Sequence, residues 1–372
     1  MALFDENVTI VPAPRRRFSR GTVVGLWALA VALIALLILT FLPTAYVIQQ
    51  PGPVFNTLGT VQNSDGEDVP LISVADAETY ETSGALDLLT VQVVGNPDRR
   101  PSWFELAQAW FDPTRAVLPI DSVFTPGQST EDRNQQNAAM MVDSQEEAKA
   151  AALTELGYTV PSHIAVHDVL DDSASVGVLE AGDLILTAGG TTVTTAQQVR
   201  DAVNASDGAP VEFGIERDGV ESEVSVTPRE DDVNGQRQWL VGVQLTTDFD
   251  LPVDVTIQLD NVGGPSAGMM FALGIIDVLS PGDLTGGNQI AGTGTIDAAG
   301  DVGPIGGIRQ KLYGAQEAGA EYFLAPADNC DEVVGHVPDG LRVFSVVTLD
   351  DSLTALEAIR DGGDLDALPT CS

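Results

Sequence analysis

The sequence predicts an α+β protein that begins with a transmembrane helix and has a mostly β unit between segments of mixed helices and strands. Residues 22–42 lack charge and proline, residues 158–228 contain several short strand patterns, and residues 240–350 alternate between strand and helix patterns. A length of 372 residues exceeds one ordinary domain, and an apolar fraction of 44% permits a sizeable core. That apolar fraction, with only 19% charged residues, excludes a uniformly disordered chain.

The run from Thr22 to Leu42, TVVGLWALAVALIALLILTFL, predicts a helix that spans a membrane. Its 21 residues would extend about 31 Å as a helix, which matches the thickness of a bilayer core. The run follows four arginines, Arg15, Arg16, Arg17 and Arg20. The positive-inside rule therefore keeps residues 1–21 in the cytoplasm as a tail, and the rest of a single-pass membrane protein outside.

A cleaved signal peptide is the rival interpretation of this run. The apolar core of a signal peptide has about 7–15 residues and is followed by small residues at the cleavage site. The observed run is longer, and Pro43-Thr44-Ala45 is a poor cleavage sequence. The sequence therefore favours an anchor that contacts the membrane through residues 22–42.

Charge and rare residue types limit the chemistry that the chain can carry. The net charge of -37 argues against nucleic acid as a partner, because nucleic-acid binding needs a basic surface. The two lysines are Lys149, which follows Glu146 by three residues as in a solvated ion pair, and Lys311. Cys330 and Cys371 both lie in the exported part, where one disulfide or two free thiols are both compatible with the sequence. With three histidines and no metal-ligand spacing, we expect no metal and no cofactor.

The segment before residue 158 gives local predictions. Residues 85–95 have the pattern of a strand. Residues 103–112, WFELAQAWFD, predict either a core helix or a surface that rests on the membrane interface, where tryptophan is enriched. Another helix is predicted from Asp143, with Asp143 or Ser144 as its N-cap and Gly157 as its stop.

Residues 158–228 combine alternating β-branched runs with glycine turns and one helix at 194–206. The core Val178-Leu179-Glu180-Ala181-Gly182-Asp183-Leu184-Ile185-Leu186, followed by Gly190 and Arg217-Asp218-Gly219, resembles a PDZ domain of the kind that accompanies bacterial proteases. The resemblance implies that an extended peptide adds a strand to a sheet edge. A clear Gly-Leu-Gly-Phe loop is missing, and Gly157-Tyr158-Thr159-Val160 is the nearest substitute.

The segment after residue 228 begins with a predicted polar linker at 229–240. A strand is predicted at 252–259, and two helices at 266–279 and 306–320. The tail, residues 361–372, is predicted to be loose because it is rich in glycine and aspartate.

The sequence Gly263-Gly264-Pro265-Ser266-Ala267-Gly268 places a serine among small residues at the predicted start of a helix. Small neighbours allow a substrate backbone to approach closely, and a helix N-terminus supplies N–H groups for an oxyanion. A helix N-cap is the structural alternative for this serine.

A serine nucleophile needs a base. No motif of a histidine triad occurs, which leaves a lysine. Lys311 shares an apolar stripe of the helix 306–320 with Ile308, Leu312 and Ala315, where partial desolvation would lower its pKa. The alternative is a lysine whose apolar stem packs while its amine reaches water.

Residues 261–326 are similar to the proteolytic domain of the Lon family, which uses a Ser–Lys pair. The resemblance rests on NVGGPSAG (261–268), AGTGT (291–295) and DVGPIGGIRQKL (301–312). It assigns the nucleophile to Ser266 and the general base to Lys311, with Thr293 as a hydrogen-bond partner of the lysine. The residues that support the site are then Gly264, Pro265 and Ala267. Thr295 departs from the family's pattern, because Lon itself usually has Glu there.

The resemblance implies an α/β Lon-type domain, residues 48–157 and 240–350, that is split by an inserted PDZ domain at 158–228, as in membrane-anchored PDZ-containing Lon-like proteases of bacteria. Neither lysine follows the glycine loop of an ATP-binding motif. We therefore expect an ATP-independent serine endopeptidase that cleaves unfolded or exposed extracytoplasmic polypeptides. An anchored, non-catalytic PDZ receptor or scaffold is the alternative. Homo-oligomers are implied by the resemblance alone.

Overall fold

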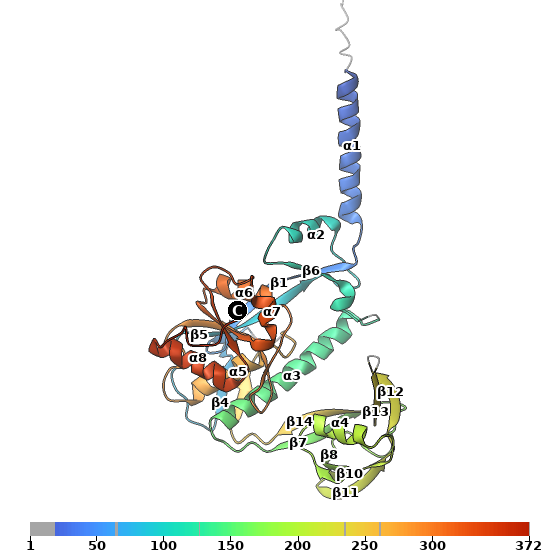
Figure 1. Cartoon of the computed structure of the whole chain (residues 1–372), viewed down its shortest axis with the longest axis vertical. Coiled ribbons are helices and arrows are strands. Elements are labelled where there is room, and N and C mark those ends of the chain that lie inside the picture. Colours follow the sequence, from blue (N-terminus) through green and yellow to red (C-terminus); the bar gives the residue numbers. More distant parts are fainter. Residues whose placement is uncertain (1–18, 64–65, 126, 234–235, 260–261, 372) are drawn as a thin grey trace, which may run out of the picture.

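The computed structural model describes residues 19–63, 66–125, 127–233, 236–259 and 262–371 (Figure 1). An N-terminal apolar helix and two large sheets with helices around them confirm the predicted α+β class. Most of the predicted tail, including Arg15, Arg16 and Arg17, lies outside the described residues.

Helix α1 (Arg20–Phe41) stands away from the rest of the chain (Figure 1). Ser19 caps it by accepting a hydrogen bond from the N–H of Thr22. The span from Arg20 to Leu39 has a mean hydropathy of 2.8, and no other described part of the chain covers its apolar side chains. Among the described residues, α1 is the one helix long and apolar enough to cross a membrane. The same properties fit an anchor or a signal sequence.

Helix α2 (Trp103–Trp110) lies beside the end of α1 (Figure 1). Ser102 caps it in a capping box with Glu105. Leu106 and Ala109 are buried, whereas Phe104 and Trp110 are exposed. The predicted aromatic segment is therefore a helix with one face in the core and the other face open.

The first large sheet joins segments from both ends of the chain that follows α1. Its order is β20-β19-β16-β5-β1-β6, with parallel pairing from β20 to β5 and antiparallel pairing of β1 with β5 and β6. The strands are β1 (Tyr46–Asn56), β5 (Ala85–Val94), β6 (Ala116–Pro119), β16 (Gln289–Gly292), β19 (Tyr322–Pro326) and β20 (Arg342–Val346).

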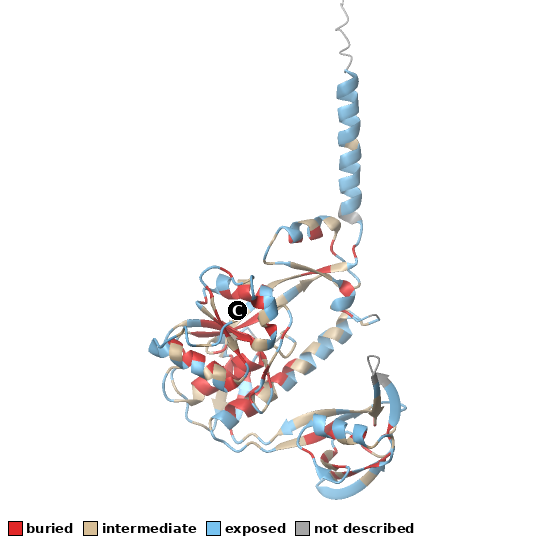
Figure 2. Cartoon of the chain, viewed as in Figure 1, coloured by how far each residue is buried: buried red, intermediate tan, exposed pale blue. Residues whose placement is uncertain are grey.

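Helices cover both faces of this sheet. Helices α3 (Thr130–Glu155), α5 (Gly268–Leu279) and α8 (Leu349–Asp361) pack on one face, where Leu86 and Leu88 of β5 belong to the same hydrophobic cluster. Helix α6 (Ile308–Ala318) and the short α7 (Cys330–Val333) pack on the other face, against Leu89. The resulting three layers are buried where they meet (Figure 2).

The second large sheet has the order β11-β10-β8-β7-β14, and β9 pairs with β8. Its core also includes Val199 and Val203 of helix α4 (Ala196–Ala205). The strands are β7 (Ser162–Val169), β8 (Leu184–Ala188), β9 (Thr191–Thr192), β10 (Val211–Arg217), β11 (Val220–Val226) and β14 (Val243–Phe249).

The predicted polar linker at 229–240 is wrong. These residues form a hairpin of β12 (Arg229–Val233) and β13 (Gln236–Leu240), and β13 continues into β14 of the second sheet. Trp239 explains why this polar segment is ordered. Its ring packs on the second core, and its backbone N–H donates to Asn204 Oδ1 of α4 at 2.9 Å.

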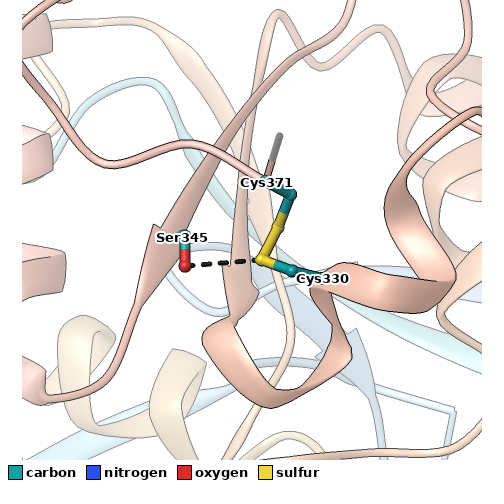
Figure 3. Close-up of a disulfide and its surroundings, with 3 residues drawn as sticks. All are labelled: Cys330, Ser345 and Cys371. Carbon is teal, nitrogen blue, oxygen red and sulfur yellow. Dashed lines mark hydrogen bonds between the residues drawn. A yellow bond between two sulfur atoms is a disulfide. The ribbon is translucent and has the colours of Figure 1, made fainter.

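Two further predictions of element ends are corrected. The helix predicted from Asp143 begins earlier, at Thr130, with Ser129 as its N-cap in a capping box with Asp132. The tail is not loose, because a disulfide joins Cys330 to Cys371 (Figure 3). The N–H of Ser345 also donates to the carbonyl of Pro369 at 2.9 Å.

Short elements complete the architecture. The antiparallel pairs are β2 (Thr60–Gln62) with β3 (Asp68–Pro70), β4 (Ile72–Ala75) with β15 (Asp254–Ile257), and β17 (Thr295–Ile296) with β18 (Val302–Gly303). Two 3₁₀ turns lie at Ile120–Ser122 and Ala327–Asn329.

Candidate active site

Ser266 lies in the turn before α5, and it is not the N-cap of that helix. The N-cap is Ala267, which has no side-chain cap, so the capping alternative for the serine is wrong. The carbonyl of Ser266 accepts the N–H of Gly294 at 3.0 Å and the hydroxyl of Thr293 at 2.9 Å. These two bonds fix the backbone of the serine against the loop that follows β16.

Lys311 lies in the first turns of α6, where its N–H donates to the carbonyl of Gly307. The side chain is only 1% exposed, so the alternative of an amine that reaches water is wrong. Its Nζ lies 2.7 Å from Ser266 Oγ and 2.8 Å from Thr293 Oγ1. Desolvation by burial lowers the pKa of Lys311 from 10.5 to about 7.

Thr293 is fully buried, and its hydroxyl group links the backbone of Ser266 to the side chain of Lys311. Its hydroxyl proton is committed to the carbonyl of Ser266, so its oxygen can only accept a hydrogen bond from Lys311. A neutral Lys311 that donates one proton to Thr293 can direct its lone pair at the hydroxyl of Ser266. The three residues named from the sequence therefore meet in one hydrogen-bonded group.

Helix α3 holds the segment before the serine, which the sequence did not reveal. The N–H of Gly264 donates to the carbonyl of Asn137 at 2.9 Å, and Ser144 Oγ donates to the carbonyl of Pro265 at 2.9 Å. Gly264 has φ = 90°, a conformation that suits glycine. Ser144 is thus a buried anchor in the middle of α3 and not an N-cap.

Close packing explains the glycine after Ala267. A Cβ on Gly268 would lie 2.8 Å from Ser144 Oγ and 2.9 Å from Ile296 Cγ2. Within the part of the chain that the structure describes, the N–H groups of Ser266 and Ala267 make no hydrogen bond. Both amides precede α5, whose N-terminus favours negative charge.

A hollow of about 410 Å³ opens beside Ser266 and Ala267. One wall is β5 from Leu88 to Gln92, and Val262 and Gly263 line it as well. Beyond Leu88, β5 pairs with β1 on one edge only, because its pairing with β16 ends at Leu88. Within the described residues, an unpaired strand edge therefore lies in the wall of the hollow that contains the serine.

Two further titratable side chains outside this group lie in ion pairs. Lys149 forms the expected ion pair with Glu146 at 2.8 Å, although its side chain is only 13% exposed. His163 of β7 lies 3.1 Å from a carboxylate oxygen of Asp250. Thr295 begins β17 and pairs with Gly303. Among the described residues, no three His, Cys, Asp or Glu side chains are grouped as metal ligands.

Family models match two parts of the chain. Residues 250–357 match the Lon protease (S16) C-terminal proteolytic domain. Residues 128–227 match the PDZ domain. The resemblances drawn from the sequence motifs are thereby confirmed, and the chain carries a Lon-type proteolytic segment and a PDZ domain.

Curated relatives are similar to the proteolytic segment. Lon protease 1 of Sorangium cellulosum (strain So ce56) is 39% identical over 100 residues, which are 26% of this chain and 12% of that protein. The archaeal Lon protease of Methanothermobacter thermautotrophicus is 31% identical over 109 residues, which are 29% of this chain and 17% of that protein. The chain thus spans only a small part of the length of these relatives.

Solved structures similar to the second sheet include the PDZ domain of an SdrC-like protein from Listeria monocytogenes. It is 24% identical, covers 22% of this chain and 85% of that one, and has a TM-score of 0.20. The PDZ assignment therefore rests on the family model and on the motif in the sequence.

Proposed function

We propose that the chain is a membrane-anchored serine endopeptidase that works without ATP and uses Ser266 and Lys311 as its catalytic pair. The observation that carries the proposal is the 2.7 Å separation of Ser266 Oγ from the amine of Lys311, a residue that is only 1% exposed. A lysine in water is protonated at neutral pH and cannot act as a base. Burial lowers the pKa of Lys311 to about 7, so the neutral amine is available near neutral pH.

In the proposed first step, neutral Lys311 accepts the hydroxyl proton of Ser266 while Oγ attacks the carbonyl carbon of a peptide bond. The amides of Ser266 and Ala267, which have no partner in the described chain, would stabilise the oxyanion. Protonated Lys311 then donates its proton to the leaving nitrogen, and an acyl-enzyme ester remains. Water, deprotonated by the same lysine, hydrolyses the ester and restores Ser266.

The free edge of β5 supports a position for the substrate. An extended peptide that pairs with Thr90 and Val91 would lie in the hollow beside Ser266. Only an extended segment can pair with a strand edge, so the substrates would be unfolded or exposed parts of polypeptides. Neither Lys149 nor Lys311 belongs to an ATP-binding glycine loop, which supports cleavage without ATP.

The PDZ unit is proposed to recruit or regulate substrates. Within the described residues β14 pairs with β7 alone, and its outer edge borders α4. The segment Leu240-Val241-Gly242-Val243 leads into β14, with Gly242 at φ = 74°. This glycine-containing apolar segment, which follows the predicted linker, is a candidate for the loop that holds a peptide carboxylate by its backbone N–H groups.

The experiment compares Ser266→Ala, Lys311→Met and the control Lys149→Met in the full chain, with an unfolded protein as substrate and no ATP. We expect the first two variants to lose at least about 10⁴-fold in hydrolysis, as when a catalytic nucleophile or base is removed, and the control to cleave like the wild type. Hydrolysis by Ser266→Ala would refute the proposal. A wild-type chain that binds C-terminal peptides but never cleaves would favour the scaffold.

A further inference from the structure

Helix α2 presents a row of aromatic side chains that no described part of the chain covers. Phe104, Trp110 and Phe111 are 49%, 61% and 90% exposed. Phe104 and Phe111 are seven residues apart, and a separation of seven returns to the same side of a helix. Trp103 is half-buried and packs on the inner cluster with Leu106 and Ala109. The exposed rings of Phe104, Trp110 and Phe111 form the surface that we call the aromatic face.

The opposite side of α2 is already occupied. Leu106 and Ala109 are buried and form a cluster with Ile48 of β1. Because the inner side rests on β1, the exposed rings of the aromatic face lie away from the sheet. Exposed aromatic rings on a helix that is already anchored indicate a second surface against which the helix packs.

The position of α2 identifies that surface. Pro43, two residues after the end of α1, forms a β-bridge with Ser102, the N-cap of α2. Thr44 Oγ1 donates to the carbonyl of Pro101 at 2.9 Å. Figure 1 shows α2 lying across the lower end of α1. A chain anchored through α1 would hold α2 at the depth where the bilayer core ends, since 22 helical residues span about 33 Å.

We propose that the aromatic face of α2 rests in the headgroup region of the bilayer that α1 spans, and so fixes the proteolytic unit against the membrane surface. The inference rests on the proposed membrane anchor. Tryptophan and phenylalanine are the side chains expected at this depth, where amphipathic helices insert their apolar side. Two exposed arginines next to the helix, Arg99 and Arg100, offset the exposed acids Asp98 and Glu105, so this end of an otherwise acidic chain carries no excess negative charge.

The test measures the depth of Trp110 in vesicles. The full chain is reconstituted in vesicles of phosphatidylethanolamine and phosphatidylglycerol, with Trp27, Trp103 and Trp239 replaced by phenylalanine. A matched chain keeps only Trp239, which lies in the hairpin of the second sheet. We expect lipids brominated near the headgroup to quench the emission of Trp110 and not that of Trp239, and aqueous iodide to quench Trp110 weakly.

Quenching of Trp110 by iodide but not by bromine would place the face in water, and protection from both would place it against protein such as a second copy. Either result would overturn the inference. A second variant avoids changes in the core. Phe111→Ser in the wild-type chain should reduce the quenching of total tryptophan emission by brominated lipids. Val220→Ser, a control at an exposed position of the second sheet, should not. Peptide hydrolysis in the same vesicles tests the catalytic proposal separately, because it depends on Ser266 and not on the depth of α2.

Discussion

Two buried titratable side chains, Asp183 in the unit of the second sheet and Lys311 in the unit of the first, differ in how their charge is balanced. Asp183 in the PDZ unit is 1% exposed and accepts two hydrogen bonds from Arg217, at 2.6 and 2.7 Å. Burial alone would raise the pKa of Asp183, but the hydrogen bonds and charge of Arg217 outweigh it and hold the pKa below its usual range. Lys311 has two neutral hydroxyl partners, and burial lowers its pKa to about 7.

The difference separates a structural group from a reactive one. A buried charge with a matched partner stays ionised and stabilises the surrounding loops, whereas a buried amine without one shifts toward its neutral form. A buried neutral amine is not explained by packing, because an apolar side chain would fill the same space with a smaller desolvation free energy. A proton acceptor next to a serine hydroxyl is the use that this arrangement supports.

The largest effect on stability is expected when the ion pair of Asp183 with Arg217 is removed. Asp183→Asn removes the charge that pairs with Arg217 and should destabilise the PDZ unit by about 3 kcal/mol, as when one partner of a buried pair is lost. Urea unfolding followed by the fluorescence of Trp239, which packs on the second core, measures this change. Hydrolysis of a short peptide should be retained, because Ser266 and Lys311 lie outside this sheet. Unchanged stability would show that the pair contributes little.

The pH dependence of hydrolysis should follow the protonation of Lys311, which has no charged partner. The reaction needs neutral Lys311, whose pKa is lowered to about 7, so kcat/KM should fall about tenfold per unit as pH drops below that value. Above pH 8 the rate should level off. Rates measured from pH 5 to 9 with a short uncharged peptide test this. A rate that keeps rising to pH 10 would mean that the lysine is not desolvated.

Replacement of the lysine should stabilise the fold while it removes activity. The folded pKa of Lys311 lies below its unfolded value, so the unfolded chain binds more protons between about pH 7 and 10 and wild-type stability rises with pH in that window. Lys311→Met lacks this penalty and should gain about 1–2 kcal/mol at pH 7, and less at pH 10. Thermal unfolding at both pH values provides the measurement. A destabilised variant at pH 7 would show that the amine contributes more to packing than it costs.

The sequence predicted the group of Ser266, Thr293 and Lys311 better than the residues that support it. The motifs around Ser266 and Lys311 limit the chemistry, and the resemblance to the Lon family assigns a role to each of the three, so these roles could be proposed without coordinates. Ser144 could not be recognised, because its partner Pro265 lies 121 residues away in the chain. Likewise, the strand β13 resembles a linker in composition, and only its contact with α4 through Asn204 explains its order. Pairing across long separations leaves little trace in local composition.

The smallest effect is expected from a substitution of Ser144, which supports the turn before Ser266. Ser144→Ala removes one hydrogen bond to the carbonyl of Pro265, worth about 1 kcal/mol, and leaves the catalytic group intact. If α3 positions the turn before Ser266, the loss should appear mainly in kcat, by roughly fivefold, since a misplaced nucleophile affects the chemical step more than binding. Ser144→Thr, which keeps the hydroxyl but adds a methyl group close to Gly268, separates the bond from the packing. If Ser144→Ala lost the stability of this hydrogen bond but kept its kcat, Ser144 would contribute to the fold alone.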